Sequence, residues 1–226
     1  MEQNGIIEKT LEVFKKCEVK TFPIDCIKII TGLDIPLYKY SDLPEAKIYK
    51  CLQVSDDAFT LQGVIFYNDK FPHTERQRFS LMHEVGHIIL NHEGESSDNE
   101  KEADLFASNI LAPRSVIWHL HFNSVKDICE TFDVSCMAAN RILADYKIFP
   151  LWEHKNLHKN IRDWFFPYTH ATTKDATKKE SDYYDNDSDF LNVHRFVVGE
   201  EYIFSNTEYY HLHGPVLYKK SHYDYL

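Results

Sequence analysis

The sequence predicts an α+β fold, with helices packed beside a short sheet and a C-terminal extension. Apolar residues recur at helical spacing over residues 79–89, and a second helical pattern follows at 99–107. Short runs rich in β-forming side chains lie at 48–52 and 63–67. With 43% hydrophobic residues, the chain has enough apolar side chains for a core.

The length of 226 residues is enough for one domain and an added segment. We expect a domain over residues 1–150 and an extension over 151–226. Within the extension, residues 171–189 are polar and charged, which predicts a mobile linker. The composition of the extension does not decide between partner recognition and covering of a functional site.

Charge and cysteine content exclude some classes of protein. The net charge of −10 argues against a protein that coats nucleic acid, because phosphate binding needs clustered positive charge. The five cysteines are scattered and form no Cys-x-x-Cys pair, which is typical of reduced thiols. No apolar run approaches the roughly 20 residues of a membrane span. We therefore predict a soluble, cytoplasmic protein without a membrane partner.

The N-terminal part predicts two helices and then extended segments. Residues 6–17 have an amphipathic pattern, and a second helix begins at residue 23 and ends near Gly32. Residues 36–40 look extended, and 48–52 and 63–67 are predicted strands.

The strand at 63–67 has two interpretations. It contains Val64, Ile65 and Phe66. If it lies at the edge of the sheet, its backbone can pair with an extended peptide substrate. If it lies in the interior of the sheet, it has no contact with substrate.

The helix over residues 79–89 contains the motif His83-Glu84-x-x-His87. Residues i and i+4 lie on one face of a helix, so the two imidazoles can bind one zinc ion together. Glu84 then lies close enough to act as general base for a water on the zinc. Gly86 is unfavourable inside a helix, and close approach of another backbone would explain it.

The helix over 99–107 offers carboxylates for the same site. Glu100 and Asp104 share a face, with Ala103 leaving room for close packing. A carboxylate can be the third zinc ligand, and Asp104 can accept the other ring N–H of a ligating histidine. The alternative is a solvated acidic face. His92 is a further candidate ligand, disfavoured because a continued helix would place it off the face of the histidine pair.

Three separated blocks carry a resemblance to a known family: residues 78–87, the pattern Glu100-x-x-Ala103-Asp104 that follows, and residues 111–113. Over about residues 5–148 the chain resembles the ImmA/IrrE family of zinc metallopeptidases.

The resemblance implies a small zincin-like domain of the gluzincin type. An active-site helix and a second metal-ligand helix would hold Zn2+ beside a short sheet. The resemblance assigns zinc binding to His83, His87 and Glu100, and the general base to Glu84. Glu102 is the alternative third ligand.

Residues 124–143 have a helix–turn–helix pattern, which invites a DNA-binding interpretation. Only Asn140 and Arg141 could read bases from the second helix, and the chain is acidic. A helical pair that packs on the domain is the favoured interpretation, so direct nucleic-acid binding is not expected.

The predicted function is that of a zinc-dependent endopeptidase. The resemblance implies a protein substrate, namely a helix–turn–helix transcriptional repressor or an antitoxin-like partner. The alternative is a zinc-stabilised binding protein, an anti-repressor that captures its partner without cleavage. His-His-carboxylate sites also accept manganese or iron, so the metal stays open.

Overall fold

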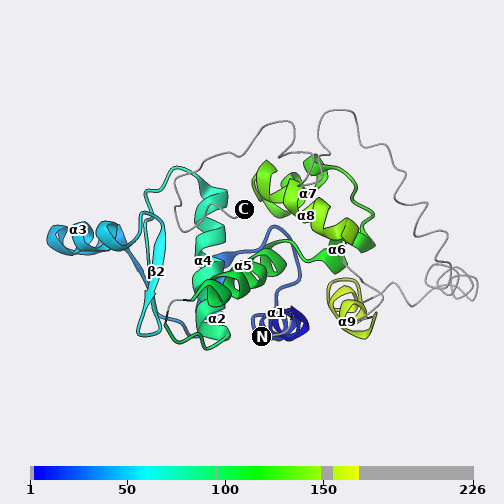
Figure 1. Ribbon diagram of the computed structural model, residues 1–226, viewed down its shortest axis with the longest axis horizontal. Coiled ribbons are helices and arrows are strands. Elements are labelled where there is room, and N and C mark those ends of the chain that lie inside the picture. Colours follow the sequence, from blue (N-terminus) through cyan, green and yellow to red (C-terminus); the bar gives the residue numbers. More distant parts are fainter. Residues whose placement is uncertain (1–2, 95, 149–154, 168–226) are drawn as a thin grey trace, which may run out of the picture. The chain divides into compact units, whose positions relative to one another are not determined.

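The computed structural model describes residues 3–94, 96–148 and 155–167 (Figure 1). The described residues divide into two compact units, one within residues 1–113 and 131–135 and the other within residues 114–130 and 136–226. The domain boundary expected after residue 150 lies outside the described residues. The expected linker at 171–189, with the rest of the extension beyond residue 167, also lies outside them.

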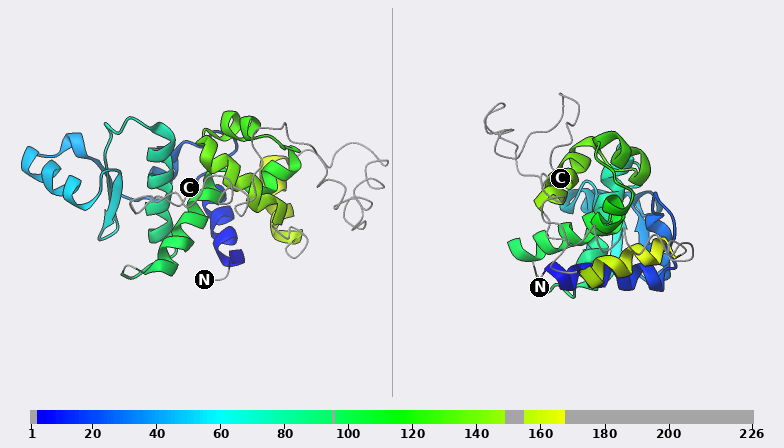
Figure 2. Two further views of the ribbon diagram at one scale, coloured as in Figure 1. Left: turned by 45° about the horizontal axis from the view of Figure 1, so that its top comes forward. Right: turned by 90° about the vertical axis from the view of Figure 1, so that its right-hand side faces the viewer.

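Two long helices form the centre of the first unit. Helix α4 spans Thr74–Ile89 and helix α5 spans Ser97–Leu111, which confirms both predicted helices. Ser96 caps α5, since its side chain accepts a hydrogen bond from the backbone N–H of Asn99. The two helices pack side by side (Figure 2).

Two N-terminal helices surround this pair. Helix α1 spans Gln3–Lys16 and packs on α5, whereas α2 spans Cys26–Gly32 and contacts α4. Asp25 caps α2 by accepting a hydrogen bond from the backbone N–H of Lys28. Burial of their apolar faces contributes to one shared core. This core includes Phe14, Ile29, Ile30, Met82, Phe106 and Ile110.

The sheet has three short strands: β1 (Leu37–Lys39), β2 (Ala58–Leu61) and β3 (Val64–Tyr67). Their order is β1-β3-β2, with β1 parallel and β2 antiparallel to β3. Ile65 and Tyr67 are buried on one face, and α4 packs against β2 and β3. The extended segment expected at the start of the sheet and the strand expected at 63–67 are both confirmed.

The interpretation of β3 as a substrate-binding edge strand is wrong. Val64, Ile65 and Phe66 all lie in the central strand, which is paired on both sides. Only an edge strand has N–H and C=O groups available for an added peptide. Strand β3 is therefore an interior strand of the sheet. In the described part of the sheet, the edges belong to β1 and β2.

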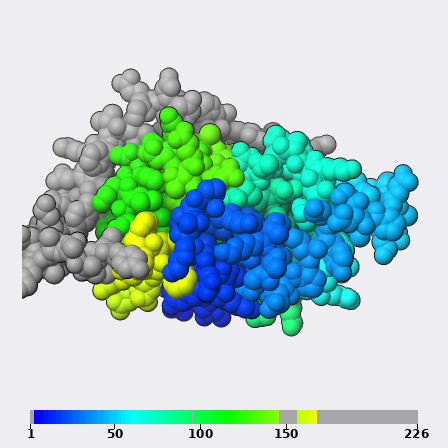
Figure 3. All heavy atoms as spheres, turned by 180° about the vertical axis from the view of Figure 1, so that it is seen from behind, coloured from blue at the N-terminus to red at the C-terminus, as the bar shows by residue number. Residues whose placement is uncertain are grey.

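The strand predicted at 48–52 is also wrong, because these residues lie in helix α3 (Glu45–Val54). A single turn of 3-10 helix, η1 (Tyr40–Asp42), and Pro44 precede it. Pro44 is the N-cap residue of α3, and Glu45 in the first turn suits a helix N-terminus. Cys51 is the one buried residue of α3, and the helix projects from its unit (Figure 3).

The second unit is helical in the part that the structure describes. It contains α6 (Arg114–His119), most of α7 (Val125–Phe132), α8 (Cys136–Ile148) and α9 (Lys155–Phe165). Helices α6 and α9 pack together.

A buried hydrogen bond of 2.6 Å joins Ser115 Oγ of α6 and His158 Nδ1 of α9. Among the described residues, none of the helices has the length and apolar character needed to cross a lipid bilayer.

Candidate metal centre

The two motif histidines face one another from successive turns of α4. Their Nε2 atoms are 2.9 Å apart. The side chain of His83 is almost fully buried, and that of His87 is 19% exposed. The i, i+4 spacing thus directs both ring nitrogens to one point, as predicted.

Glu100 reaches the same point from α5. One carboxylate oxygen lies 3.3 Å from His83 Nε2 and the other 3.5 Å from His87 Nε2. One ligand atom from each of these three residues lies within 4.8 Å of the other two. Two imidazoles and a carboxylate are a donor set that suits a catalytic zinc ion.

Asp104 lies one helical turn after Glu100 and contacts the far side of His83. His83 Nδ1 is 2.8 Å from its carboxylate. Burial by itself lowers the pKa of His83. The hydrogen bonds to Asp104 and Glu100, together with the negative charges of Asp104 and Glu84, outweigh this effect and raise the pKa to about 9.

His87 has a corresponding contact, which the sequence analysis missed. His87 Nδ1 lies 3.0 Å from His92 Nδ1, and His92 Nε2 lies 3.1 Å from a carboxylate oxygen of Glu102. Glu102 is thus engaged by His92, away from the point where the three candidate ligands meet. Burial is the largest cause that lowers the pKa of His92, so its ring is neutral at neutral pH.

One arrangement of protons satisfies this chain of contacts. Neutral His92 donates from Nε2 to Glu102 and accepts at Nδ1 from His87. His83 donates from Nδ1 to Asp104. In the metal-free protein His83 also carries a proton on Nε2, and a metal would replace this proton. Both motif histidines could then present Nε2 to the metal, as expected when the other ring nitrogen is held by a hydrogen bond.

A left-handed turn brings His92 back to the site. Asn91 has φ +53°, and the backbone N–H groups of Asn91 and His92 donate to the carbonyls of Ile88 and His87. This is a Schellman motif, for which asparagine is a common residue at the left-handed position. The Leu90-Asn91 pair was therefore the signal by which the position of His92 could have been predicted.

Gly86 allows the two helices to approach closely at this level. A Cβ atom on Gly86 would lie 3.2 Å from both Cα and the carbonyl oxygen of Ala103. The expected reason for a glycine in mid-helix, close approach of another backbone, is confirmed. Since Ala103 lies between Glu100 and Asp104, this contact sets how near both carboxylates come to α4.

Glu84 follows His83 on α4 and is buried, with 6% of its surface exposed. Its charge raises the pKa of His83 and, after burial and Cys51, that of Tyr40. The Tyr40 hydroxyl donates to the carbonyl of Ser55 at 3.1 Å. Glu84 is thus a buried carboxylate within electrostatic range of a candidate ligand.

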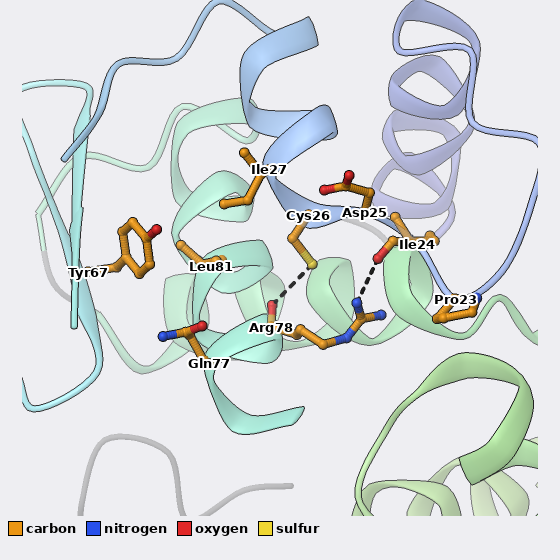
Figure 4. Close-up of a pocket in the computed structure, with 9 residues that line it drawn as sticks. All are labelled: Pro23, Ile24, Asp25, Cys26, Ile27, Tyr67, Gln77, Arg78 and Leu81. Atoms are coloured by element: carbon orange, nitrogen blue, oxygen red, sulfur yellow. Dashed lines mark hydrogen bonds between the residues drawn. The ribbon is translucent and has the colours of Figure 1, made fainter. Parts of the chain in front are cut away.

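A separate cavity of about 390 Å³ lies among α2, β3 and the first half of α4 (Figure 4). Its wall includes Ile27, Tyr67 and Leu81, and none of the three candidate ligands lines it. Cys26 points to the carbonyl of Arg78 there, and burial raises the pKa of its thiol to about 11. This cavity is therefore separate from the three candidate metal ligands.

Fold and site together define a class: an α+β domain with a His-His-carboxylate cluster between two adjacent helices. A family model described as the IrrE N-terminal-like domain matches residues 40–143. Over these residues the chain is thus similar to the IrrE N-terminal-like family of peptidases, which confirms the resemblance to the ImmA/IrrE family. A comparison with curated proteins gave no match.

Proposed function

We propose that this protein is a zinc-dependent endopeptidase. His83, His87 and Glu100 hold the metal, and Glu84 is the general base. The observation that carries the proposal is that both histidines turn Nε2 toward Glu100 while Asp104 and His92 hold their Nδ1 atoms. A peptidase family match over the same residues supports it.

Each residue of the cluster has a defined task in this proposal. A zinc ion, when bound, supplies Lewis acidity that polarises the scissile carbonyl and makes a water more acidic. Asp104 holds His83 in the tautomer that presents Nε2. His92 and Glu102 do the same for His87. The donor set also suits manganese or iron, and zinc is proposed because two imidazoles and a carboxylate are common in zinc peptidases.

Glu84 is the residue proposed to move the proton. Its carboxylate takes a proton from the attacking water and gives it to the leaving amine when the peptide bond breaks. Burial suits this task, because a desolvated carboxylate is a stronger base than one in water.

The proposed substrate is a protein, a helix–turn–helix repressor or an antitoxin-like partner cut at one site. This part of the proposal rests on the family resemblance. The proposed location is the cytoplasm, which is supported by the finding that none of the five cysteines forms a disulfide.

The substitution Glu84→Gln tests hydrolysis apart from binding. The glutamine keeps the size of the side chain but cannot take a proton, so metal content should equal that of the wild type. Cells that express either form are compared by labelling of new protein N-termini. Glu93→Gln is the matched control, since Glu93 is exposed beyond the end of α4.

Cleavage products that appear with the wild type and Glu93→Gln, and not with Glu84→Gln, would support the endopeptidase. The opposite result is that Glu84→Gln has the same effect on the cells as the wild type, and that neither of these two forms produces new N-termini. The protein would then capture its partner without cleavage. That result would replace the proposal with the anti-repressor alternative.

A further inference from the structure

Two cysteines of the second unit lie in contact. Cys129 is in α7, and Cys136 is the first residue of α8. Their Sγ atoms are 3.7 Å apart. A disulfide bond has an S–S length of about 2.05 Å, so rotation of the two side chains can close most of the remaining gap.

These two thiols differ from the other three in accessibility. Cys136 is exposed and Cys129 is partly exposed, whereas Cys17, Cys26 and Cys51 are buried. Oxidants reach exposed thiols first, and burial raises the pKa of the other three, which leaves less of the reactive thiolate.

We propose that Cys129 and Cys136 are an oxidisable dithiol, a modification site that forms an intramolecular disulfide under hydrogen peroxide. The inference does not depend on the metal centre or on peptidase activity. It rests on the contact between the two sulfur atoms and on the exposure of Cys136.

The chemistry balances with one peroxide per disulfide. The exposed thiol of Cys136 attacks peroxide, breaks its O–O bond and becomes a sulfenic acid, with release of one water. The thiol of Cys129 then attacks this sulfur, forms the S–S bond and displaces the second water. The two sulfurs lose two electrons in total, and these electrons reduce the peroxide.

The disulfide would close a loop between Cys129 and Cys136, and the middle residues of this loop are already held by other contacts. Phe132 is fully buried, and its ring meets that of Phe22 edge to face at 4.8 Å. Arg78 of α4 donates to the carbonyl of Phe132 at 3.2 Å and pairs with Asp133 at 3.3 Å. Oxidation would therefore restrict a segment that contacts the helix of the metal motif.

The test uses the reduced full-length chain and one equivalent of hydrogen peroxide. Remaining thiols are blocked, and the chain is digested with a protease that cuts after glutamate. Because Glu130 lies between the two cysteines, the fragments 103–130 and 131–153 stay together only through the proposed disulfide. Cys51→Ala is the matched control for loss of a buried thiol.

In the wild type and Cys51→Ala, the two fragments should remain joined, and reduction should separate them. The wild type should lose two of its five thiols, about tenfold faster than any buried thiol reacts. Cys129→Ser should give no joined fragments and should leave a sulfenic acid on Cys136 that dimedone traps. Separate fragments from the oxidised wild type, or disulfides only between chains, would overturn the proposal.

Discussion

His92 Nδ1 lies 3.0 Å from His87 Nδ1, and this contact gives His87 a defined orientation. The other nitrogen of His92 is held by Glu102 at 3.1 Å. The site is therefore supported on two sides, by Asp104 behind His83 and by the His92–Glu102 pair behind His87. Glu102 contacts His92, and His92 contacts the candidate ligand His87, so in the proposed site Glu102 would support a ligand and would not itself bind the metal.

Substitution of His92 should weaken metal binding without removing a ligand. His92→Ala leaves Nδ1 of His87 without its acceptor, so the ring can turn and change tautomer. Loss of such a supporting contact typically lowers metal affinity about 10–100-fold. Zinc affinity can be measured by competition with a chelator of known affinity.

Two variants accompany this measurement. His92→Gln keeps an acceptor in reach of His87 and should retain more affinity than His92→Ala. His73→Ala removes an exposed histidine that lies just before α4 and should change nothing. Equal affinities for the wild type and His92→Ala would show that the ring of His87 is oriented by other contacts.

The stability of the metal-free protein should depend on pH through His83. Its pKa is about 9 in the folded chain, above the ordinary value of 6.5. The protonated ring thus stabilises the fold fully below pH 6.5, and this contribution disappears as the pH rises through 9. The loss amounts to roughly 3 kcal/mol. Urea unfolding at several pH values in the presence of a chelator measures it.

Asp104→Asn separates this effect from other titrating groups. The amide oxygen still accepts a hydrogen bond from His83, but the negative charge is gone, so the folded pKa should fall. The variant should lose less stability than the wild type between pH 6.5 and 9. If the free energy of unfolding depends on pH in the same way in both proteins, the effect does not come from the pair of His83 and Asp104.

Gly86→Ala should destabilise the domain, although alanine favours helix by about 1 kcal/mol. The new Cβ would lie 3.2 Å from the backbone of Ala103 and from the ring of Phe106, and overpacking of this kind costs about 1–3 kcal/mol. We expect a net loss of roughly 1 kcal/mol in urea unfolding of the metal-free chain. A gain in stability would mean that α5 shifts away without strain.

The spacing of residues in the sequence was sufficient to predict the two long helices and the candidate ligands that they bring together. The i, i+4 pairs His83/His87 and Glu100/Asp104 each define one helix face. Because α4 and α5 are long and strongly periodic, both were predicted with the correct residues on the shared side. Gly86 even indicated where the two backbones would approach.

The short helix α3, the place of β3 in the sheet and the turn after α4 could not be predicted in the same way. Residues 48–52 contain β-forming side chains, yet Pro44 and the helical spacing of Ile48 and Cys51 make this segment a helix. The central position of β3 depends on pairing with β1, which is distant in sequence. His92 reaches His87 only because Asn91 adopts a left-handed conformation.

The metal content of the purified protein tests the central claim most directly. The wild type, Glu100→Ala, Glu102→Ala and the exposed control Glu93→Ala are supplied with zinc, dialysed and measured by mass spectrometry of the metal. We predict one zinc per chain in the wild type and the control, loss of zinc with Glu100→Ala, and retained but weaker binding with Glu102→Ala. A wild type that holds no zinc, or a Glu100→Ala variant that holds it as tightly as the wild type, would contradict the proposed centre.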